Sequence, residues 1–367
     1  MVTKVAHVTT AHARDEVRVF LKECLSLVAA DYDVHMIVAD GLGDVTVRGV
    51  QIHDVGNVRG RFHRMMILPG RMWITARSVN ARLYHFHEPE LLLIALLLQM
   101  SGAHIVYDSH EDVPRAVMSR KWIPPKIRWL VSFVFEHFEN FIASRISAII
   151  GATPHIAKRF SVVNDESVDI NNYPLASEFE SSVESYGKEK TVCYLGGISM
   201  NRGIFEMVNA LKLVDVRLIL AGPFENRDTE RAVKMLPSWA KVDYCGQVSR
   251  EEVRRIMSMS RAGLLFYHPD PNHVNAQPIK MFEYMSAGIP VIASKFPLWR
   301  EIIEGNDCGL CVDPQNPMAI AQAIDFLVIH PERAREMGEN GLRAVQTRYN
   351  WGIEEKKLLD LYKRLLN

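Results

Sequence analysis

The chain has 367 residues, a length that favours two domains, and 48 % of them are hydrophobic, enough to form buried cores. Lysine plus arginine and aspartate plus glutamate both number 43, so no global field attracts nucleic acid. The longest apolar run, 91–98, is far shorter than the about 20 residues that span a bilayer, and the N-terminus lacks the apolar core of a signal peptide. Five widely spaced cysteines indicate a reducing compartment, so we expect a cytoplasmic protein.

The first half alternates β-rich and helical runs, which is typical of a parallel sheet covered on both faces. Strands are predicted at 5–10, 34–40, 83–88, 104–109 and 147–153, with an amphipathic helix at 15–30. The loop after the first strand, TTAHARDE, contains no G-x-G-x-x-G and no Walker pattern. We therefore expect the first domain not to hold a nucleotide.

A second set of β–turn–α steps follows the polar stretch SSVESYGKEK. Strands are predicted at 191–197, 216–222, 242–246, 262–267, 290–294 and 308–312. The organisation predicted is an α/β chain of two Rossmann-like, doubly wound domains with a cleft between them. The first domain spans 1–173, the linker 174–187 and the second domain 188–350, and the helix at 351–367 is expected to pack back on the first domain.

The segment NHVNAQPIKMFEYMSAGIP, residues 272–290, predicts an anion site. We expect a helix that begins at Pro278 and ends before Gly288 and Pro290. A helix N-terminus presents unpaired N–H groups and a positive dipole end, which suit a phosphate. Lys280 lies in the first turn, and Glu283 lies too far inside to act as a cap. A carboxylate there can accept two hydrogen bonds from a ribose diol.

Several motifs together resemble the family-four glycosyltransferases. In the second half they are YLGGISMNRGI, AGP, YCGQVSREEV, QPIKMFEYMSAGIPVIAS and CGLCVDP, in the family's order and spacing. In the first half, TTAHARDEVRVFLKECLSL, HFHEPELL and YDSHEDVP resemble a bacterial polysaccharide-assembly branch. The resemblance implies the GT-B fold and a sugar nucleotide held by the second domain.

Two positions depart from the family pattern. Asn275 stands where a first glutamate usually precedes Glu283 by eight positions, which puts in doubt how the transferred sugar is held. Gly197 replaces a usual arginine and Arg202 a usual lysine, leaving Arg202 and Lys280 to neutralise the diphosphate. Arginine suits this role because its guanidinium binds phosphate oxygens in a fork.

The resemblance implies catalytic roles for His110, Arg202 and Glu283. Donor binding is assigned to Gly196, Gly197, Arg202, Gln247, Val248, Asn275, Gln277, Pro278, Ile279, Lys280 and Glu283. Acceptor binding is assigned to Asp15, Arg18, His87 and Glu88.

Simpler interpretations of some of these residues stay open. Glu88 could simply begin the next helix, where a carboxylate suits the dipole. Asp15 and Arg18 could form only a pair three residues apart. Gln247 and Val248 could form only a turn, and His110 could be a loop histidine without a role.

Two basic stretches without acids lie in the first half, at 55–87 and 113–135. Within them, 62–73 and 119–135 mix arginine and lysine with tryptophan, methionine and isoleucine. Such segments bind anionic membrane surfaces, although a basic face over a core helix would look the same. We expect peripheral contact with the inner face of the cell membrane.

The resemblance implies retaining transfer of a sugar from a nucleoside-diphosphate sugar to a hydroxyl of a glycan or lipid-linked acceptor, in cell-surface polysaccharide assembly. We expect no metal and no cofactor, because the helix dipole, Arg202 and Lys280 can stabilise the leaving diphosphate and no D-x-D motif is present. Two alternatives stay open: a GT-B sugar-nucleotide epimerase, and a non-catalytic GT-B subunit that binds sugar nucleotides. A phosphorylase is disfavoured, because nothing marks a lysine that carries a covalent cofactor.

Overall fold

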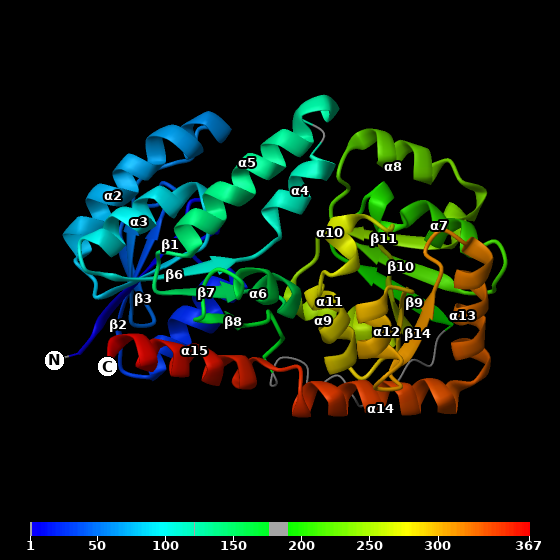
Figure 1. Cartoon of the computed structure of the whole chain (residues 1–367). Coiled ribbons are helices and arrows are strands. Elements are labelled where there is room, and N and C mark those ends of the chain that lie inside the picture. Colours follow the sequence, from blue (N-terminus) through cyan, green and yellow to red (C-terminus); the bar gives the residue numbers. More distant parts are fainter. Residues whose placement is uncertain (1, 121, 176–189) are drawn as a thin grey trace. The chain divides into compact units, whose positions relative to one another are not determined.

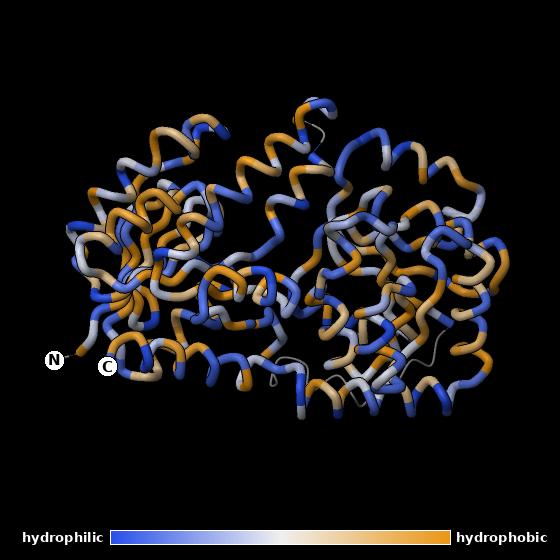
Figure 2. Tube along the Cα trace, in the orientation of Figure 1, coloured by the Kyte–Doolittle hydropathy of each residue, from blue (hydrophilic) through white to orange (hydrophobic). Residues whose placement is uncertain are grey.

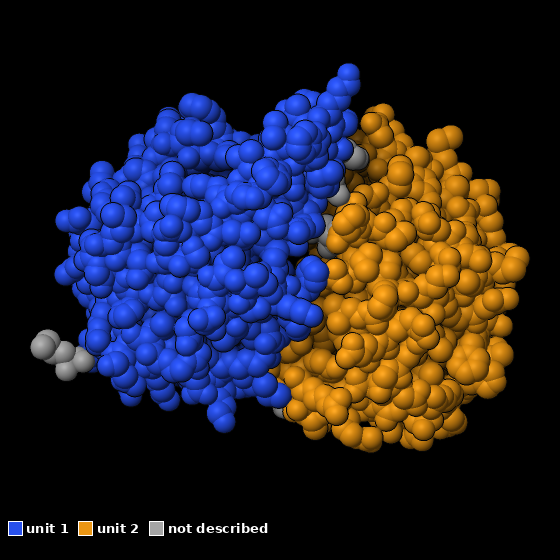
Figure 3. Space-filling view, viewed as in Figure 1, with its two compact units in different colours: residues 1–172, 351–367 blue, residues 173–350 orange. Residues whose placement is uncertain are grey.

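A computed structural model describes residues 2–120, 122–175 and 190–367 of the protein (Figure 1). The chain divides into two compact units (Figure 3). Unit 1 comprises residues 1–172 and 351–367, and unit 2 comprises residues 173–350. Most of the linker predicted at 174–187 lies outside the described residues. Each unit has an α/β fold with a largely parallel sheet, as the sequence predicted.

Unit 1 is built on an eight-stranded sheet, counted over its described residues, with the order β3-β4-β2-β1-β5-β6-β7-β8. All neighbours pair in parallel except β3 and β4. The strands are β1 (Lys4–Val8), β2 (Asp33–Val38), β3 (Val45–Val47), β4 (Val50–Asp54), β5 (Leu83–Phe86), β6 (His104–Ser109), β7 (Ala148–Gly151) and β8 (Ser167–Asp169). The chain reverses its direction of winding between β1 and β5, the kind of point where open α/β sheets bind ligands.

The β3–β4 hairpin and β8 were not predicted. β3 and β8 are three residues each, too short to show an alternating pattern, and the hairpin turns through Arg48 and Gly49, both at positive φ. Arginine rarely adopts a positive φ, so the sequence does not indicate a turn at Arg48.

The helix predicted at 15–30 is two helices in the structure. The π-helix η1 (Val17–Cys24) leads into α1 (Leu25–Ala29). The other helices of unit 1 are η2 (His63–Ile67), α2 (Leu68–Val79), η3 (Pro89–Leu91), α3 (Leu92–Met100), α4 (Val113–Ser119), α5 (Pro125–Ala143), α6 (Pro154–Phe160) and α15 (Trp351–Leu366).

The C-terminal helix α15 is anchored within unit 1 by side chains along its length. Trp351 donates from Nε1 to Ser26 Oγ at 3.0 Å, and Glu354 accepts from the backbone N–H of Asn171 at 2.7 Å. The hydroxyl of Tyr362 lies 2.9 Å from Nδ1 of His85, deep in the core. This helix therefore belongs to the same compact unit as strands from the other end of the chain.

Unit 2 contains a six-stranded parallel sheet among its described residues, in the order β11-β10-β9-β12-β13-β14. The strands are β9 (Thr191–Leu195), β10 (Arg217–Ala221), β11 (Val242–Gly246), β12 (Ala262–Leu265), β13 (Val291–Ser294) and β14 (Gly309–Val312). Alternate residues of β9 enter different cores: Cys193 and Leu195 pack on one face, Val192 and Tyr194 on the other. Both faces are buried, and the winding reverses between β9 and β12.

The helices of unit 2 cover both faces of this sheet. They are η6 (Met200–Arg202), α7 (Ile204–Ala210), α8 (Arg227–Lys234), η7 (Pro237–Lys241), α9 (Arg250–Met259), α10 (Pro271–Val274), α11 (Ile279–Ser286), α12 (Pro297–Ile303), α13 (Pro317–Ile329) and α14 (Pro331–Thr347). Figure 2 shows mixed colouring along the outer helices such as α14, as expected of amphipathic helices. Among the described helices, none combines the length and apolarity needed to cross a membrane.

Candidate functional site

The first candidate site lies where the winding of the unit 2 sheet reverses. Gly196 follows β9 at φ 117°, and its N–H donates to Ala221 O at 2.8 Å, which joins the loops after β9 and β10. A Cβ on Gly222 would lie 2.1 Å from Gly196 O, so only glycine lets these loops pack backbone to backbone. The N–H of Gly222 in turn donates to Gly246 O at 2.7 Å, which brings in the loop after β11.

The guanidinium of Arg202 turns back onto Gly197. Its Nη1 donates to Gly197 O at 2.9 Å, and a Cβ on Gly197 would lie only 2.6 Å from this atom. The second departure from the family pattern therefore has a steric explanation. The absence of a side chain at Gly197 leaves space for the guanidinium of Arg202. The same guanidinium lies over the ring of Tyr267, 5.5 Å from its centre, just after β12.

Lys280 points inward from the first turn of α11. Its side chain is buried, and Nζ lies 4.2 Å from the centre of the Tyr194 ring. Among the described residues Nζ has no hydrogen-bond partner. Burial, reinforced by the charge of Arg202, lowers the pKa of Lys280 to about 7. A Cβ on Gly196 would lie 3.0 Å from Nζ, so the lysine reaches the same glycine turn as Arg202.

Glu283 is the fifth residue of α11 and is held by a residue that the sequence analysis did not single out. Arg250, at the start of α9, donates from Nη1 to Glu283 Oε1 at 2.8 Å. The Glu283 side chain is 10 % exposed and that of Arg250 47 % exposed, so the pair lies at the edge of the core. No spacing rule connects two residues that are 33 positions apart, so Arg250 could not be recognised from the sequence.

The remaining predicted donor residues lie near this turn or near the start of α11. Gln247 is exposed, whereas Val248 packs against the core. Asn275 is exposed in the turn after α10, a short helix where the sequence predicted a loop. Gln277 accepts a hydrogen bond from Tyr173 at 3.1 Å. Helix α11 begins at Ile279, so Pro278 caps the helix instead of starting it.

The second candidate site lies at the β1/β5 reversal of unit 1 and includes Glu88. Its carboxylate accepts from Thr9 Oγ1 at 2.6 Å and from the backbone N–H of Thr10 at 2.9 Å. Glu88 does precede η3, but its side chain does not cap that helix. Burial raises the pKa of Glu88 to about 7. The carboxylate thus organises the loop after β1 from the N-cap position of η3.

Arg18 is buried and does not pair with Asp15, which lies exposed in the loop before η1. Its Nε and Nη2 each donate to a carboxylate oxygen of Asp108 at 2.9 Å. Burial opposes ionisation of Asp108, but Arg18 and His110 outweigh it and hold the pKa of Asp108 well below its usual range. The alternative pairing of Asp15 with Arg18 is therefore wrong. The predicted acceptor contacts of both residues stay predictions.

Asp108 also holds the predicted histidines together. His110 Nε2 lies 3.1 Å from Asp108 Oδ2 and 3.3 Å from His87 Nδ1. The His12 ring stacks obliquely on that of His110, with ring centres 4.8 Å apart. Burial lowers the pKa of His87 to about 3, so His87 is neutral near neutral pH. The structure thus brings His87, Glu88 and His110 to one end of the unit 1 sheet.

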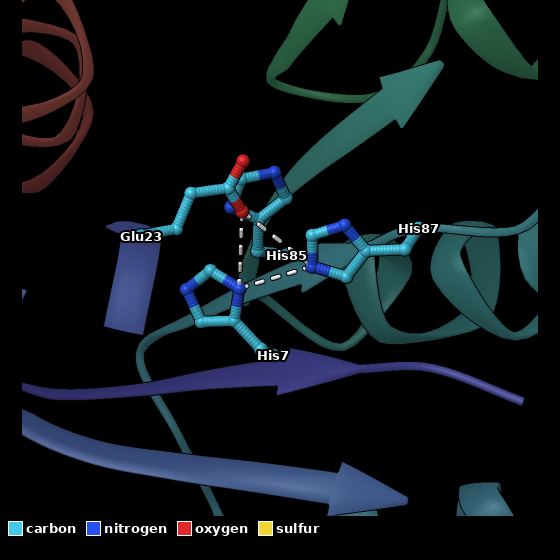
Figure 4. Close-up of side chains that lie close together, drawn as sticks. All are labelled: His7, Glu23, His85 and His87. Carbon is cyan, nitrogen blue, oxygen red and sulfur yellow. Dashed lines mark hydrogen bonds and ion pairs between the residues drawn. The ribbon is translucent and has the colours of Figure 1, made fainter. Parts of the chain in front are cut away.

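A further group of buried side chains adjoins His87, and sequence reasoning missed it. His7, His85 and Glu23 lie together with His87 in the core of unit 1 (Figure 4). A signal was present, because His85 and His87 in HFHE are two residues apart and therefore face the same side of a strand. His7 becomes recognisable only through the strand register, which pairs it with His85.

Comparison with known proteins places the C-terminal part of the chain in a family. Residues 177–344 match the family described as "Glycosyl transferases group 1". Two relatives are D-rhamnosyltransferase WbpZ of Pseudomonas aeruginosa, 23 % identical over 70 % of this chain and 66 % of that protein, and an uncharacterised glycosyltransferase of Methanocaldococcus jannaschii, 24 % identical over 56 % and 53 %. The chain thus spans between half and two thirds of the length of these curated relatives.

Solved structures match over the whole chain. The sucrose-phosphate synthase of Thermosynechococcus elongatus has a TM-score of 0.77 at 18 % identity, covering 99 % of both chains. Anabaena Alr3699/HepE, solved in complex with UDP, has a TM-score of 0.74 at 13 % identity, covering 99 % of this chain and 100 % of that one. The chain has the GT-B fold, and its residues 177–344 match the glycosyl transferases group 1 family.

Proposed function

We propose that the protein is a retaining glycosyltransferase that takes a sugar from a nucleoside diphosphate and transfers it to an acceptor hydroxyl. The observation that carries this proposal is the convergence of Arg202 and Lys280 on the Gly196–Gly197 turn. Two cations lie at one turn, and the Nζ of Lys280 is buried without a hydrogen-bond partner among the described residues, which favours a bound anion between them. A diphosphate is an anion of the right charge, and HepE, which shares the fold, is solved with UDP-glucose.

In this proposal the residues of unit 2 act on the donor. Arg202 and Lys280 neutralise the charge that develops on the leaving diphosphate, so no metal is required for that step. Glu283, oriented by Arg250, accepts hydrogen bonds from the ribose diol. Gln247 and Val248 would contact the base, and Asn275, in place of a charged residue, would hydrogen-bond the transferred sugar. Retention of configuration follows from the family resemblance.

The residues of unit 1 would act on the acceptor. Asp108 fixes the His110 ring, which lies partly exposed beside His87 and Glu88. An imidazole in this position could orient the acceptor hydroxyl. The acceptor class is the finer part of the proposal: a glycan or lipid-linked acceptor in cell-surface polysaccharide assembly. One relative, from Mycobacterium tuberculosis, is a phosphatidyl-myo-inositol mannosyltransferase, 23 % identical over 76 % of this chain.

The exposed side chains of unit 1 support the prediction, made from the basic stretches, of contact with an anionic membrane. We define the basic-apolar surface by exposed apolar side chains that lie within or just before η2 and α5. They are Phe62, Met65, Met66, Ile67, Trp122, Ile127, Trp129, Leu130, Phe133 and Val134. The guanidinium of Arg61 lies 5.0 Å from the centre of the Trp122 ring, which links the two stretches. Tryptophan beside arginine on an exposed apolar face suits the interface of an anionic bilayer.

The proposed function is tested with a panel of UDP-, GDP-, ADP- and dTDP-sugars. Thermal-shift measurements identify the donor, and mass spectrometry follows its consumption with and without candidate acceptors. We expect one donor to stabilise the protein and to be consumed with release of the nucleoside diphosphate. Binding without turnover would favour the non-catalytic subunit, and free nucleotide with an isomerised sugar, formed without acceptor, would favour the epimerase.

A further inference from the structure

Four buried side chains of unit 1 converge on one point beneath η1. His7 on β1 and His85 on β5 are register partners on neighbouring strands, and His87 follows on the same side of β5. Glu23 reaches them from η1 (Figure 4). One potential ligand atom from each of the four side chains lies within 4.8 Å of the others. All four are almost fully shielded from solvent.

The distances within this cluster approach those of a tetrahedral metal site. His7 Nδ1 lies 3.0 Å from His87 Nε2 and 3.7 Å from Glu23 Oε2, and His87 Nε2 lies 3.9 Å from the same oxygen. Around Zn²⁺, with metal–ligand bonds of about 2.0–2.1 Å, tetrahedral ligand atoms are about 3.3 Å apart. Small side-chain shifts would therefore let these atoms surround one ion.

Several polar atoms of the cluster lack hydrogen-bond partners among the described residues. They are Nε2 of His85 and both carboxylate oxygens of Glu23. Glu23 Oε1 is in ion-pair contact with Arg18 Nε at 3.1 Å, but Arg18 is already bonded to Asp108. The single buried guanidinium of Arg18 thus faces the two buried carboxylates of Glu23 and Asp108. An additional positive charge would balance these three groups.

The groups around the cluster match the outer shell of a metal site. His85 Nδ1 lies 2.9 Å from the Tyr362 hydroxyl, which is also 3.4 Å from His7 Nε2. His87 Nδ1 lies 3.5 Å from Asp108 Oδ2. Each histidine therefore has its second nitrogen near a hydroxyl or carboxylate, which fixes the ring and directs the other nitrogen inward.

From this geometry we propose that His7, Glu23, His85 and His87 bind one Zn²⁺ ion in the core of unit 1. Three imidazoles and one carboxylate are a ligand set that zinc accepts, and four protein ligands without solvent access make a closed, structural site. The ion would join β1, β5 and η1 and hold His87 against Asp108. The sequence analysis expected no metal, and this site is separate from the donor diphosphate.

The test measures the metal in the full-length chain, produced with a tag that contains no histidine. The protein is unfolded in denaturant with a chelator, which removes any bound metal. It is then refolded with or without added Zn²⁺ and passed over a sizing column. We expect about one zinc ion per folded chain and a higher Tm with zinc than without. Zinc binds the folded state, so its binding free energy adds to the free energy of unfolding. Folded protein with no bound zinc and an unchanged Tm would overturn the zinc site. The charges of the cluster would then be balanced by a bound proton.

Two variants and a matched control locate the ion. Glu23→Gln and His85→Gln should each reduce the zinc content at least about tenfold. His53→Gln should retain it, because His53 stacks on His35 elsewhere in unit 1, with the two nitrogens 2.8 Å apart. Equal zinc content in all three variants, or stoichiometric retention of a different metal by the wild type, would overturn the assignment. Should the two variants fail to fold, the wild-type comparison still decides.

Discussion

Nη1 of Arg202 and the carbonyl oxygen of Gly197 are joined by a hydrogen bond of 2.9 Å, and the guanidinium fills the space that a side chain at 197 would need. Two departures from the family pattern, five positions apart, are therefore one structural feature. In the proposed function, Arg202 alone supplies the positive charge for which the family pattern has a basic side chain at each of the two positions.

Gly197→Ala should displace Arg202 and weaken donor binding. A Cβ at this position would lie 2.6 Å from Nη1, so the guanidinium must move. The loss of one charge-assisted hydrogen bond to the diphosphate corresponds to about a 10- to 100-fold rise in Kd, measured by titration calorimetry. Gly70→Ala is the control, because nothing lies within 4 Å of the added methyl group. An unchanged Kd in Gly197→Ala would show that Arg202 does not contact the donor.

Lys280→Met should stabilise the protein in a pH-dependent way. Burial lowers the pKa of Lys280 to about 7, so below that pH both states carry the charge and the folded state bears the full desolvation penalty. Between this pKa and the ordinary value of 10.5 the folded state gives up a proton that the unfolded state keeps, and the penalty fades. We expect the variant to exceed the wild-type Tm by about 2–4 °C at about pH 6 and by less at about pH 9. A variant Tm below that of the wild type at acidic pH would contradict this prediction. It would mean that other groups of the folded protein stabilise the charge of Lys280 enough to offset its desolvation penalty.

Arg250 should contribute to binding of the donor's ribose and not to binding of its phosphates. Arg250→Ala leaves Glu283 without the partner at 2.8 Å that orients it, so binding of the nucleoside diphosphate should weaken about 3- to 10-fold. Inorganic pyrophosphate, which has no ribose, should bind the variant and the wild type equally. Arg255→Ala is the control on the same helix, because it removes an exposed pair with Glu252 and a contact with Met259 Sδ but no contact with Glu283. An equal loss of affinity for pyrophosphate would contradict the assignment.

The basic-apolar surface should bind anionic membranes. The wild type should float with vesicles that contain anionic lipid and remain unbound with neutral ones, because both charge and exposed aromatic area contribute. Replacing Trp122 and Trp129 by serine should abolish flotation, whereas Val162→Ser, at an apolar position 85 % exposed elsewhere on unit 1, should not. Absence of the wild type from both floated fractions would contradict the proposal.

The sequence predicted the features that repeat along the chain. Short β-rich runs such as 104–109 and the motif around Lys280 have local signals, so the two α/β units and α11 could be anticipated. Features that depend on residues far apart in the chain could not be predicted. The Arg18–Asp108 pair spans 90 positions and the Arg250–Glu283 pair 33, and only the folded sheets bring them together. The π-helix was missed because its apolar pattern is close to that of an α-helix.

The most direct test of the proposed donor site is the affinity of Lys280→Met for the nucleoside diphosphate identified in the donor screen. We predict a Kd about 10- to 100-fold above that of the wild type, because the variant loses the buried cation beside the glycine turn. Lys295→Met should bind like the wild type, since Lys295 is exposed after β13 and pairs with Asp313. A folded Lys280→Met variant with wild-type affinity would contradict the central claim that Lys280 binds the donor diphosphate.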